Sequence, residues 1–197
     1  MADKRVLIIG DFIAASYLDE VRDDFARRAD QIEVEVVDHI LERGDSEELL
    51  QCIDSLLERH DPDVVHFNTG LADVAYHPDE GYHTVSLGQY ESNLQDVTEL
   101  LVSRLGNGVV FATTTYTHEP RYTAHGHELE RNNRDIEEYN IAAREVMLSE
   151  DVLINHLDYV ISEDDGEMLA EDGMSLSDAG QSAAARSVFE SIWGIWH

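Results

Sequence analysis

The sequence has little lysine and a large excess of acid. Lys4 is the only lysine, and 13 basic residues stand against 42 aspartates and glutamates, which gives a formal net charge of −29. A field of that sign repels nucleic acid and anionic membranes, so neither is expected as a partner. An ordinary acidic protein remains the alternative. We favour a halophilic, haloarchaeal-like protein, because molar salt shortens the screening length to about 3 Å.

The chain also lacks paired cysteines and long apolar runs. Its single cysteine, Cys52, excludes an internal disulfide and lies in a helical pattern on an apolar face, where it is expected to fill the core. No apolar run approaches the length of a membrane span, and residues 1–5 lead directly into a strand without an apolar leader. With no internal repeat, residues 1–197 are expected to form one soluble, cytoplasmic domain.

Short apolar runs alternate with segments of helical periodicity along the whole chain. The unbroken run Val6–Ile9, closed by Gly10 and Asp11, is typical of a buried parallel strand that turns sharply into a helix. Four further strands are predicted at 32–37, 63–67, 109–114 and 152–154. Helices are predicted at 13–28, from Asp45 to 60, from Tyr90 to 105, at 136–147 and at 178–193. A capping box of Asp45 and Glu48 is expected to open the second helix, and Gly106 to close the third.

Five strands alternating with helices indicate an α/β protein. We predict a three-layer α/β/α sandwich whose five-stranded parallel sheet has the flavodoxin-like order 2-1-3-4-5. In that order the crevice lies between strands one and three, outside their carboxyl ends. Asp11 and Phe12 should therefore face residues 68–73 across it. Two long polar loops, 68–87 and 115–131, are expected near the same edge, and loops of this length are usually functional.

Four segments resemble characteristic blocks of the SGNH, or GDSL-type, hydrolases. They are Gly10-Asp11-Phe12-Ile13, 64–73 (VVHFNTGLAD), 131–140 (RNNRDIEEYN) and 172–177 (DGMSLS). The resemblance covers nearly the whole chain and implies the SGNH hydrolase fold. In active members the serine of the first block attacks an ester, and its amide, a glycine and an asparagine bind the oxyanion. The last block, Asp-x-x-His, supplies the base and its orienting carboxylate, since a hydroxyl needs a base within hydrogen-bond reach.

Carried over position by position, the resemblance implies that much of this machinery is replaced. Phe12 stands at the nucleophile's position, Ala72 at the oxyanion asparagine's, and Ser175 at the base's, whereas Asp172 is retained. The second-block glycine corresponds to Gly44. Phe12 is expected to fill the volume that a scissile carbonyl needs. The residues expected to line the binding site are Asp11, which also forms the turn, Gly44, Asn68, Gly70, Ala72, Asp73 and Arg121.

Other residues are weighed as substitutes for the missing groups. Ser16 lies one turn beyond Phe12, but is more simply a small helix residue, and His66 in a strand is more simply a core histidine than a base. The histidines of the two loops, with Glu128, could bind zinc, but polar filler is favoured, and neither metal nor cofactor is expected.

Four large side chains near the loops and the chain end have a functional and a structural interpretation. Arg121 and Arg131 could anchor a carboxylate or phosphate, and pairing with nearby glutamates is the favoured alternative. Trp193 and Trp196 could form a ligand platform, and packing between helices is favoured for both.

Two functional hypotheses follow. The first is a protein of the hydrolase fold that has lost ester hydrolysis and serves as a binding or assembly module, for instance for an acylated or glycosylated small molecule. The second is an active hydrolase of the same superfamily with an unorthodox catalytic set, in which Asp172 or a loop histidine activates water. An aromatic side chain at position 12 favours the first, because it cannot attack a carbonyl.

Overall fold

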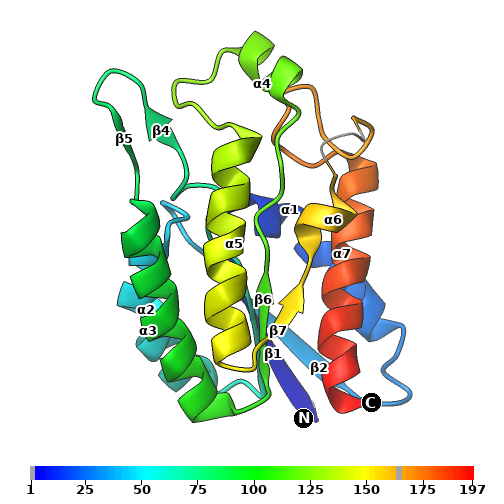
Figure 1. Ribbon diagram of the computed structural model, residues 1–197. Helices are drawn as coiled ribbons and strands as arrows, with labels where there is room; N and C mark the ends of the chain where they lie inside the picture. Colours follow the sequence, from blue (N-terminus) through cyan, green and yellow to red (C-terminus); the bar gives the residue numbers. More distant parts are fainter. Residues whose placement is uncertain (1–2, 163–165) are drawn as a thin grey trace.

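A five-stranded parallel sheet forms the centre of the protein, as seen in a computed structural model that describes residues 3–162 and 166–197 (Figure 1). Its order, β2-β1-β3-β6-β7, confirms the predicted topology. Every neighbouring pair in this sheet is parallel. The predicted strand positions are confirmed to within a few residues. The strands are β1 (Lys4–Gly10), β2 (Val34–Ile40), β3 (Val64–Phe67), β6 (Val109–Ala112) and β7 (Leu153–Asn155).

Helices cover both faces of the sheet (Figure 1). One layer contains α1 and α7, which pack against each other, and the other contains α2, α3 and α5, which pack side by side. In the described part of the chain, no helix combines the length and apolar character needed to span a membrane. The helices are α1 (Phe12–Ala26), α2 (Ser46–His60), α3 (Leu87–Leu105), α5 (Asn133–Ser149) and α7 (Asp178–Trp193).

Aromatic side chains join α1 to α7. Phe25 and Phe189 meet edge to face with their ring centroids 4.9 Å apart, and Trp193 stacks on Phe189. The ring centroid of Trp196 lies 6.3 Å from that of Phe25. Both tryptophans therefore pack helices together, as the sequence predicted.

The strand β1 sets the position of the crevice. Its residues Val6–Ile9 are fully buried, because helices cover both faces of a parallel sheet. Ile9 is level with Phe67 of β3, which in turn is level with Phe111 of β6. The segments that follow these three strands therefore leave the sheet at one common edge.

The two long loops contain short elements that the sequence did not predict. Loop 68–87 holds the antiparallel hairpin of β4 (Tyr76–His77) and β5 (Tyr82–His83), and Tyr76 also bridges Glu130. Loop 115–131 holds α4 (Glu119–His125), and the segment after β7 holds α6 (Leu157–Val160). Elements of two to seven residues complete too few periods for a pattern to appear. Pro120 in the first turn and Gly126 at φ +78° were the available signals for α4.

The predicted start of α2 differs in detail. Asp45 accepts a hydrogen bond from the Glu48 amide at 2.8 Å, but Glu48 does not complete a capping box. Its carboxylate instead accepts from the amides of Glu42, Arg43 and Gly44, and so fixes the loop that enters α2.

The end of α3 also differs from the expected left-handed cap. Gly106 has the positive φ expected of a closing glycine, +56°, but its ψ of −122° lies outside the left-handed helical region. The Gly108 amide then donates to the Leu105 carbonyl at 3.0 Å, and this turn leads the chain into β6.

Candidate functional site

A small cavity lies where β1, β3 and β6 end. Asp11, Asn68 and Thr114 are among its lining residues, which extend from Ile13 and Tyr17 of α1 to Leu157 of α6. Its volume is about 10 Å³, which is room for a single water molecule. The structure thus brings Asp11 and Asn68 together at the predicted crevice, but their own neighbours nearly fill the space between them.

Asp11 turns the chain from β1 into α1. Its Oδ1 accepts hydrogen bonds from the amides of Ile13, at 2.9 Å, and Ala14, at 3.4 Å, and so caps the helix. Burial raises the pKa of the Asp11 carboxyl to about 6, although these hydrogen bonds and the charge of Arg131 act to lower it. Asp11 is therefore a group that changes protonation just below neutral pH beside the cavity.

Gly44 and Ala72 lie next to Asp11. Gly44 has φ +75°, and a Cβ placed on it would lie 3.0 Å from the Asp11 Cβ and 3.6 Å from the Ala72 Cβ. The three positions that the resemblance assigns to the first, second and third blocks therefore meet at one point. Because a positive φ and close packing both favour glycine at position 44, its geometry alone explains the residue.

Phe12 is the first residue of α1, and it does not line the small cavity. Its side chain is 45% exposed, and it is absent from the residues that line the small cavity. The expectation that its ring occupies the volume that a scissile carbonyl needs stays a prediction. Phe12 presents an apolar surface to solvent at the place where the resemblance puts a nucleophile.

The loop after β3 is built into the fold by its polar side chains. Asp73 is fully buried and accepts from the Ser46 amide at 2.9 Å and from Thr69 Oγ1 at 2.6 Å. Burial raises the pKa of Asp73, against these hydrogen bonds. Asn68 Nδ2 donates to the Ala112 carbonyl at 3.0 Å, and so joins the ends of β3 and β6. Asn68 and Asp73 thus hold the backbone in place.

Gly70 permits the closest approach in this loop. At φ +135°, a Cβ on Gly70 would lie 2.1 Å from Thr114 Oγ1 and 3.1 Å from the Tyr90 hydroxyl. Both of those hydroxyls donate to the Thr69 carbonyl, at 3.1 Å each. A larger residue there would have to displace the Thr114 side chain and adopt a φ that favours glycine.

Asp172 forms its own turn, with His127 close by. Its Oδ1 accepts from the amides of Met174 and Ser175, and its Oδ2 accepts from Ser175 Oγ at 2.5 Å. Partial burial opposes ionisation, but the hydrogen bonds from Ser175 and Met174 prevail and lower the pKa of Asp172. The imidazole of His127 lies 3.0 Å from the backbone carbonyl of Asp172. The proton of the Ser175 hydroxyl is therefore engaged in a hydrogen bond to the Asp172 carboxylate.

The two candidate arginines bind backbone carbonyls. Arg121 Nη1 donates to Gly166 and Leu169, at 2.6 and 3.0 Å, and holds the last loop against α4. Arg131 Nε donates to Leu71 at 2.7 Å, and its Nη1 to the Tyr122 hydroxyl at 2.9 Å. The favoured pairing with nearby glutamates is wrong for both, because both guanidinium groups donate to backbone carbonyls instead.

The remaining candidates have structural partners. Burial lowers the pKa of His66 to about 3, so this fully buried histidine is neutral, and its Nε2 lies 3.3 Å from Asn155 Nδ2. Ser16 donates to the Ile13 carbonyl within α1. Among residues 3–162 and 166–197, no three histidine, cysteine or acidic side chains are placed to hold a metal.

Sequence reasoning missed the role of Asn140. Its Oδ1 accepts from the Thr114 amide at 2.8 Å, and its Nδ2 donates to the Thr114 carbonyl at 2.9 Å. This side chain therefore pairs with the backbone just beyond the end of β6. An asparagine within the apolar stripe of a helix was the available signal, because a buried amide needs partners.

Solved structures share this fold. No protein-family model and no curated protein sequence matches the chain. A lipase/acylhydrolase from Enterococcus faecalis aligns with a TM-score of 0.79 at 22% identity, over 97% of this chain and 96% of that one. LAE5, an alpha/beta hydrolase enzyme from the metagenome of Lake Arreo, Spain, gives 0.81 at 16% identity, over 98% and 97%. The acetyl xylan esterase AlAXEase gives 0.78 at 19%, over 95% and 99%.

At these identities the comparisons establish the architecture. The chain has the α/β/α fold of SGNH hydrolases, as the sequence predicted, and aligns with those structures along almost its full length. The same fold carries many different activities, so the function of the crevice depends on this chain's own residues.

Proposed function

We propose that this protein is a degenerate member of the SGNH/GDSL hydrolases that binds an acylated saccharide without hydrolysing carboxylic esters. The observation that carries the proposal is the pairing of Ser175 with Asp172 at 2.5 Å, together with Phe12 at the nucleophile position. Ser175 stands at the position of the base, and a neutral hydroxyl that donates to a carboxylate cannot take up a proton as an imidazole does. Phe12 has no hydroxyl and therefore cannot act as the nucleophile.

The binding part of the proposal rests on Phe12 and on the structural relatives. An aromatic ring that is 45% exposed at the end of β1 offers an apolar face for a sugar ring or acyl chain. The aligned structures include lipases and several acetyl xylan esterases by name. We therefore choose acetylated xylo-oligosaccharides as the probe.

Hydrolysis is tested with acetyl and butyryl esters in multimolar salt. The wild type is expected to show no turnover above background, and Phe12→Ser alone to restore little, because triad residues act as a unit. The triple variant Phe12→Ser, Ala72→Asn, Ser175→His is expected to give detectable turnover. Position 72 lies beside Asp11 and Gly44, where a side-chain amide could reach an oxyanion, and one such donor contributes about 100- to 1000-fold.

The alternative is an active hydrolase with an unorthodox base, and one observation favours it. Asp11 has a pKa of about 6 and lines the cavity, so it could accept a proton from water at neutral pH. Wild-type turnover that disappears in Asp11→Asn would establish this alternative and refute the loss of activity. Turnover lost in Asp172→Ala would instead identify Asp172 as the essential carboxylate.

Binding is tested separately by calorimetric titration with the acetylated probe. Phe12→Ala is expected to weaken binding at least tenfold, whereas Leu148→Ala, on a distant exposed position of α5, should leave it unchanged. Equal affinities for the wild type and Phe12→Ala would remove Phe12 from the binding surface.

A further inference from the structure

Exposed apolar side chains gather along one edge of the molecule. Six large apolar side chains are exposed in the described part of the chain, and four of them lie on α5, β7 and α6. These four are Ile141 and Leu148 on α5, Leu153 on β7 and Tyr159 on α6, with exposures of 45%, 72%, 46% and 69%. Ile141 and Leu148 are seven residues apart and therefore share one face of their helix. Such clustering marks an interaction surface better than scattered exposed residues do.

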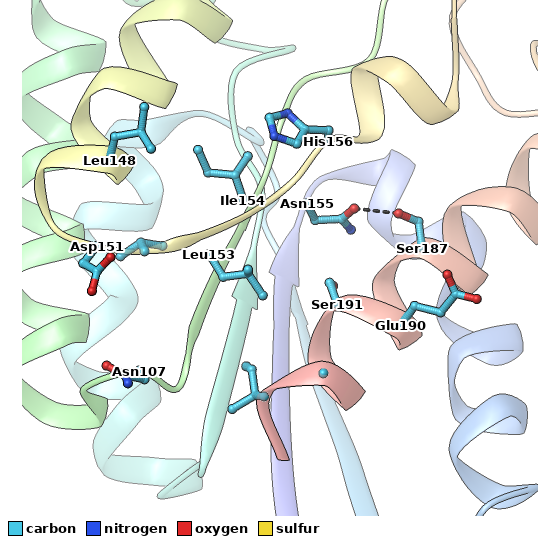
Figure 2. A pocket seen from close by; sticks show the side chains of 13 residues that line it. Asn107, Leu148, Asp151, Leu153, Ile154, Asn155, His156, Ser187, Glu190 and Ser191 are labelled. Atoms are coloured by element: carbon cyan, nitrogen blue, oxygen red, sulfur yellow. Dashed lines mark hydrogen bonds between the residues drawn. The ribbon is translucent and has the colours of Figure 1, made fainter. Parts of the chain in front are cut away.

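A groove runs along the open edge of β7, and Figure 2 shows the side chains that line it. This β7 groove is bounded by Leu148 and residues 151–156 on one side, and by the face of α7 and η1 (Gly194–Trp196) from Ser187 to Ile195 on the other. Its volume is about 910 Å³. The α7 wall consists largely of small residues, Ser187, Ser191 and Gly194, which permit a close approach.

The backbone of β7 has one residue available for pairing outside the sheet. The Asn155 carbonyl accepts from the Thr113 amide at 3.1 Å, so Asn155 faces β6. Because successive residues of a strand point their N–H and C=O groups to opposite sides, those of Ile154 face away from β6. Within residues 3–162 and 166–197, Ile154 makes no hydrogen bond on that side. One donor and one acceptor on the same residue are self-complementary.

The β7 groove also carries a somewhat smaller share of acidic residues than the chain as a whole. Of its 13 lining residues two, Asp151 and Glu190, are acidic and none is lysine or arginine, against 42 acidic residues among 197 in the whole chain. Two copies of so acidic a chain repel each other, so they can approach most readily where carboxylates are fewest. A basic partner would find few carboxylates here to pair with. The charge distribution therefore favours a second copy as the occupant.

We propose that two copies of this chain associate through their β7 edges, in antiparallel register about a two-fold axis at Ile154. In that arrangement each Ile154 donates its N–H to the other's C=O, which is the hydrogen-bonded pair of an antiparallel ladder. The two sheets become one continuous sheet, and Leu148 and Leu153 of both copies are covered. The interface is isologous, as expected of a symmetric dimer.

The oligomeric state is measured by sedimentation equilibrium in multimolar potassium chloride. The wild type should be a dimer at tens of micromolar. Ile154→Pro removes the outward N–H without removing a bond to β6, and Leu153→Glu places a carboxylate next to the two-fold axis, within the interface, so each should weaken dimerisation at least tenfold. Tyr82→Glu, at an exposed position of β5, is the matched control and should dimerise like the wild type.

Leu148→Glu keeps the test decisive if a β7 variant fails to fold, because Leu148 is 72% exposed on a helix. It too should weaken the dimer, with an unchanged far-ultraviolet dichroism spectrum. In the wild type, exchange of the Ile154 amide proton should slow as protein concentration rises. A wild type that stays monomeric at hundreds of micromolar would overturn the proposal. So would a dimer insensitive to these substitutions, or one in which the Ile154 amide exchanges equally fast at all concentrations.

Discussion

At the scale of single residues, two opposing effects act on the ionisation of Asp11. It must accept hydrogen bonds from the Ile13 and Ala14 amides to cap α1, and it must do so in a buried position next to the cavity. The cap favours the charged form, whereas desolvation penalises it and prevails, which raises the pKa of Asp11 from 3.8 to about 6. The ionised Asp11 carboxylate therefore destabilises the folded state, although an uncharged side-chain oxygen would also cap α1.

We predict that Asp11→Asn stabilises the protein above pH 6. Because the folded-state pKa is raised, the stability that this group contributes is complete below about pH 4 and is lost as the pH rises through about 6. The shift corresponds to on the order of 3 kcal/mol, and asparagine is a good N-cap. Denaturant unfolding from pH 4 to 8 in high salt should show the variant gaining about 1 to 3 kcal/mol, and only at the upper end of that range.

Asp172→Asn serves as a control, because it is expected to change the stability at neutral pH in the opposite direction. The hydrogen bonds of its turn lower the pKa of Asp172 despite partial burial, so its contribution is present at neutral pH and is lost on acidification. This variant should be less stable than the wild type at pH 7, and the difference should narrow toward pH 3. If Asp11→Asn were instead the less stable protein at pH 8, attraction to Arg131 would outweigh desolvation.

At the scale of elements, the loop after β3 depends on glycine more than the helices do. Gly70 has φ +135° and no space for a Cβ. Gly88 is exposed in the first turn of α3, and no atom lies within 4 Å of the position that its Cβ would take. The same substitution should therefore have opposite effects at two positions that lie close in sequence.

We predict that Gly70→Ala destabilises the protein by about 3 kcal/mol, since it combines a strained φ with a contact to Thr114 Oγ1. Gly88→Ala should stabilise it by about 0.5 to 1 kcal/mol, because alanine loses less entropy in a helix. Thermal and denaturant unfolding in high salt measure both. Similar effects of the two substitutions would contradict the close packing of the loop on Thr114.

The hydrophobic periodicity of the sequence predicted the long elements but not the short ones. The five long helices were predicted correctly because each completes several turns and buries one face, and the five strands because each is a short apolar run between two helical segments. The hairpin of β4 and β5 and the short helix α4 were missed because they are held by contacts from elsewhere. Tyr76 pairs with Glu130, and Gly173 accepts a hydrogen bond from the His118 amide at 2.8 Å. Neither contact leaves a local pattern.

At the scale of the whole molecule, charge is the dominant feature. Even if every one of the 13 basic residues paired with one of the 42 acidic residues, a net charge of −29 would remain on unpaired carboxylates. Many of the ion pairs that form are partly exposed, such as Lys4 with Asp63 and Arg104 with Asp54, and such pairs contribute little. Repulsion among the unpaired carboxylates therefore opposes the compact state at low ionic strength.

We predict that the unfolding temperature rises by on the order of 10 °C between about 0.1 M and multimolar potassium chloride. Several kcal/mol of relieved repulsion would produce such a shift in a domain of this size. Scanning calorimetry measures it, with sucrose of equal osmolality as the uncharged control. An equal response to sucrose would indicate general exclusion from the surface, and a flat response to salt would refute the halophilic interpretation.

The sequence by itself determined the sheet order, the helices on both faces and the segments that meet at the crevice. It could do so because periodicity, the sharp turn at Gly10-Asp11 and the handedness of crossovers are local or nearly universal rules. Only the tertiary structure decided what the side chains do there. Phe12 faces solvent, Arg121 binds carbonyls of the last loop, and Ser175 donates to Asp172. Those roles depend on which groups distant in sequence are brought within hydrogen-bond distance, and a residue's type does not specify its partner.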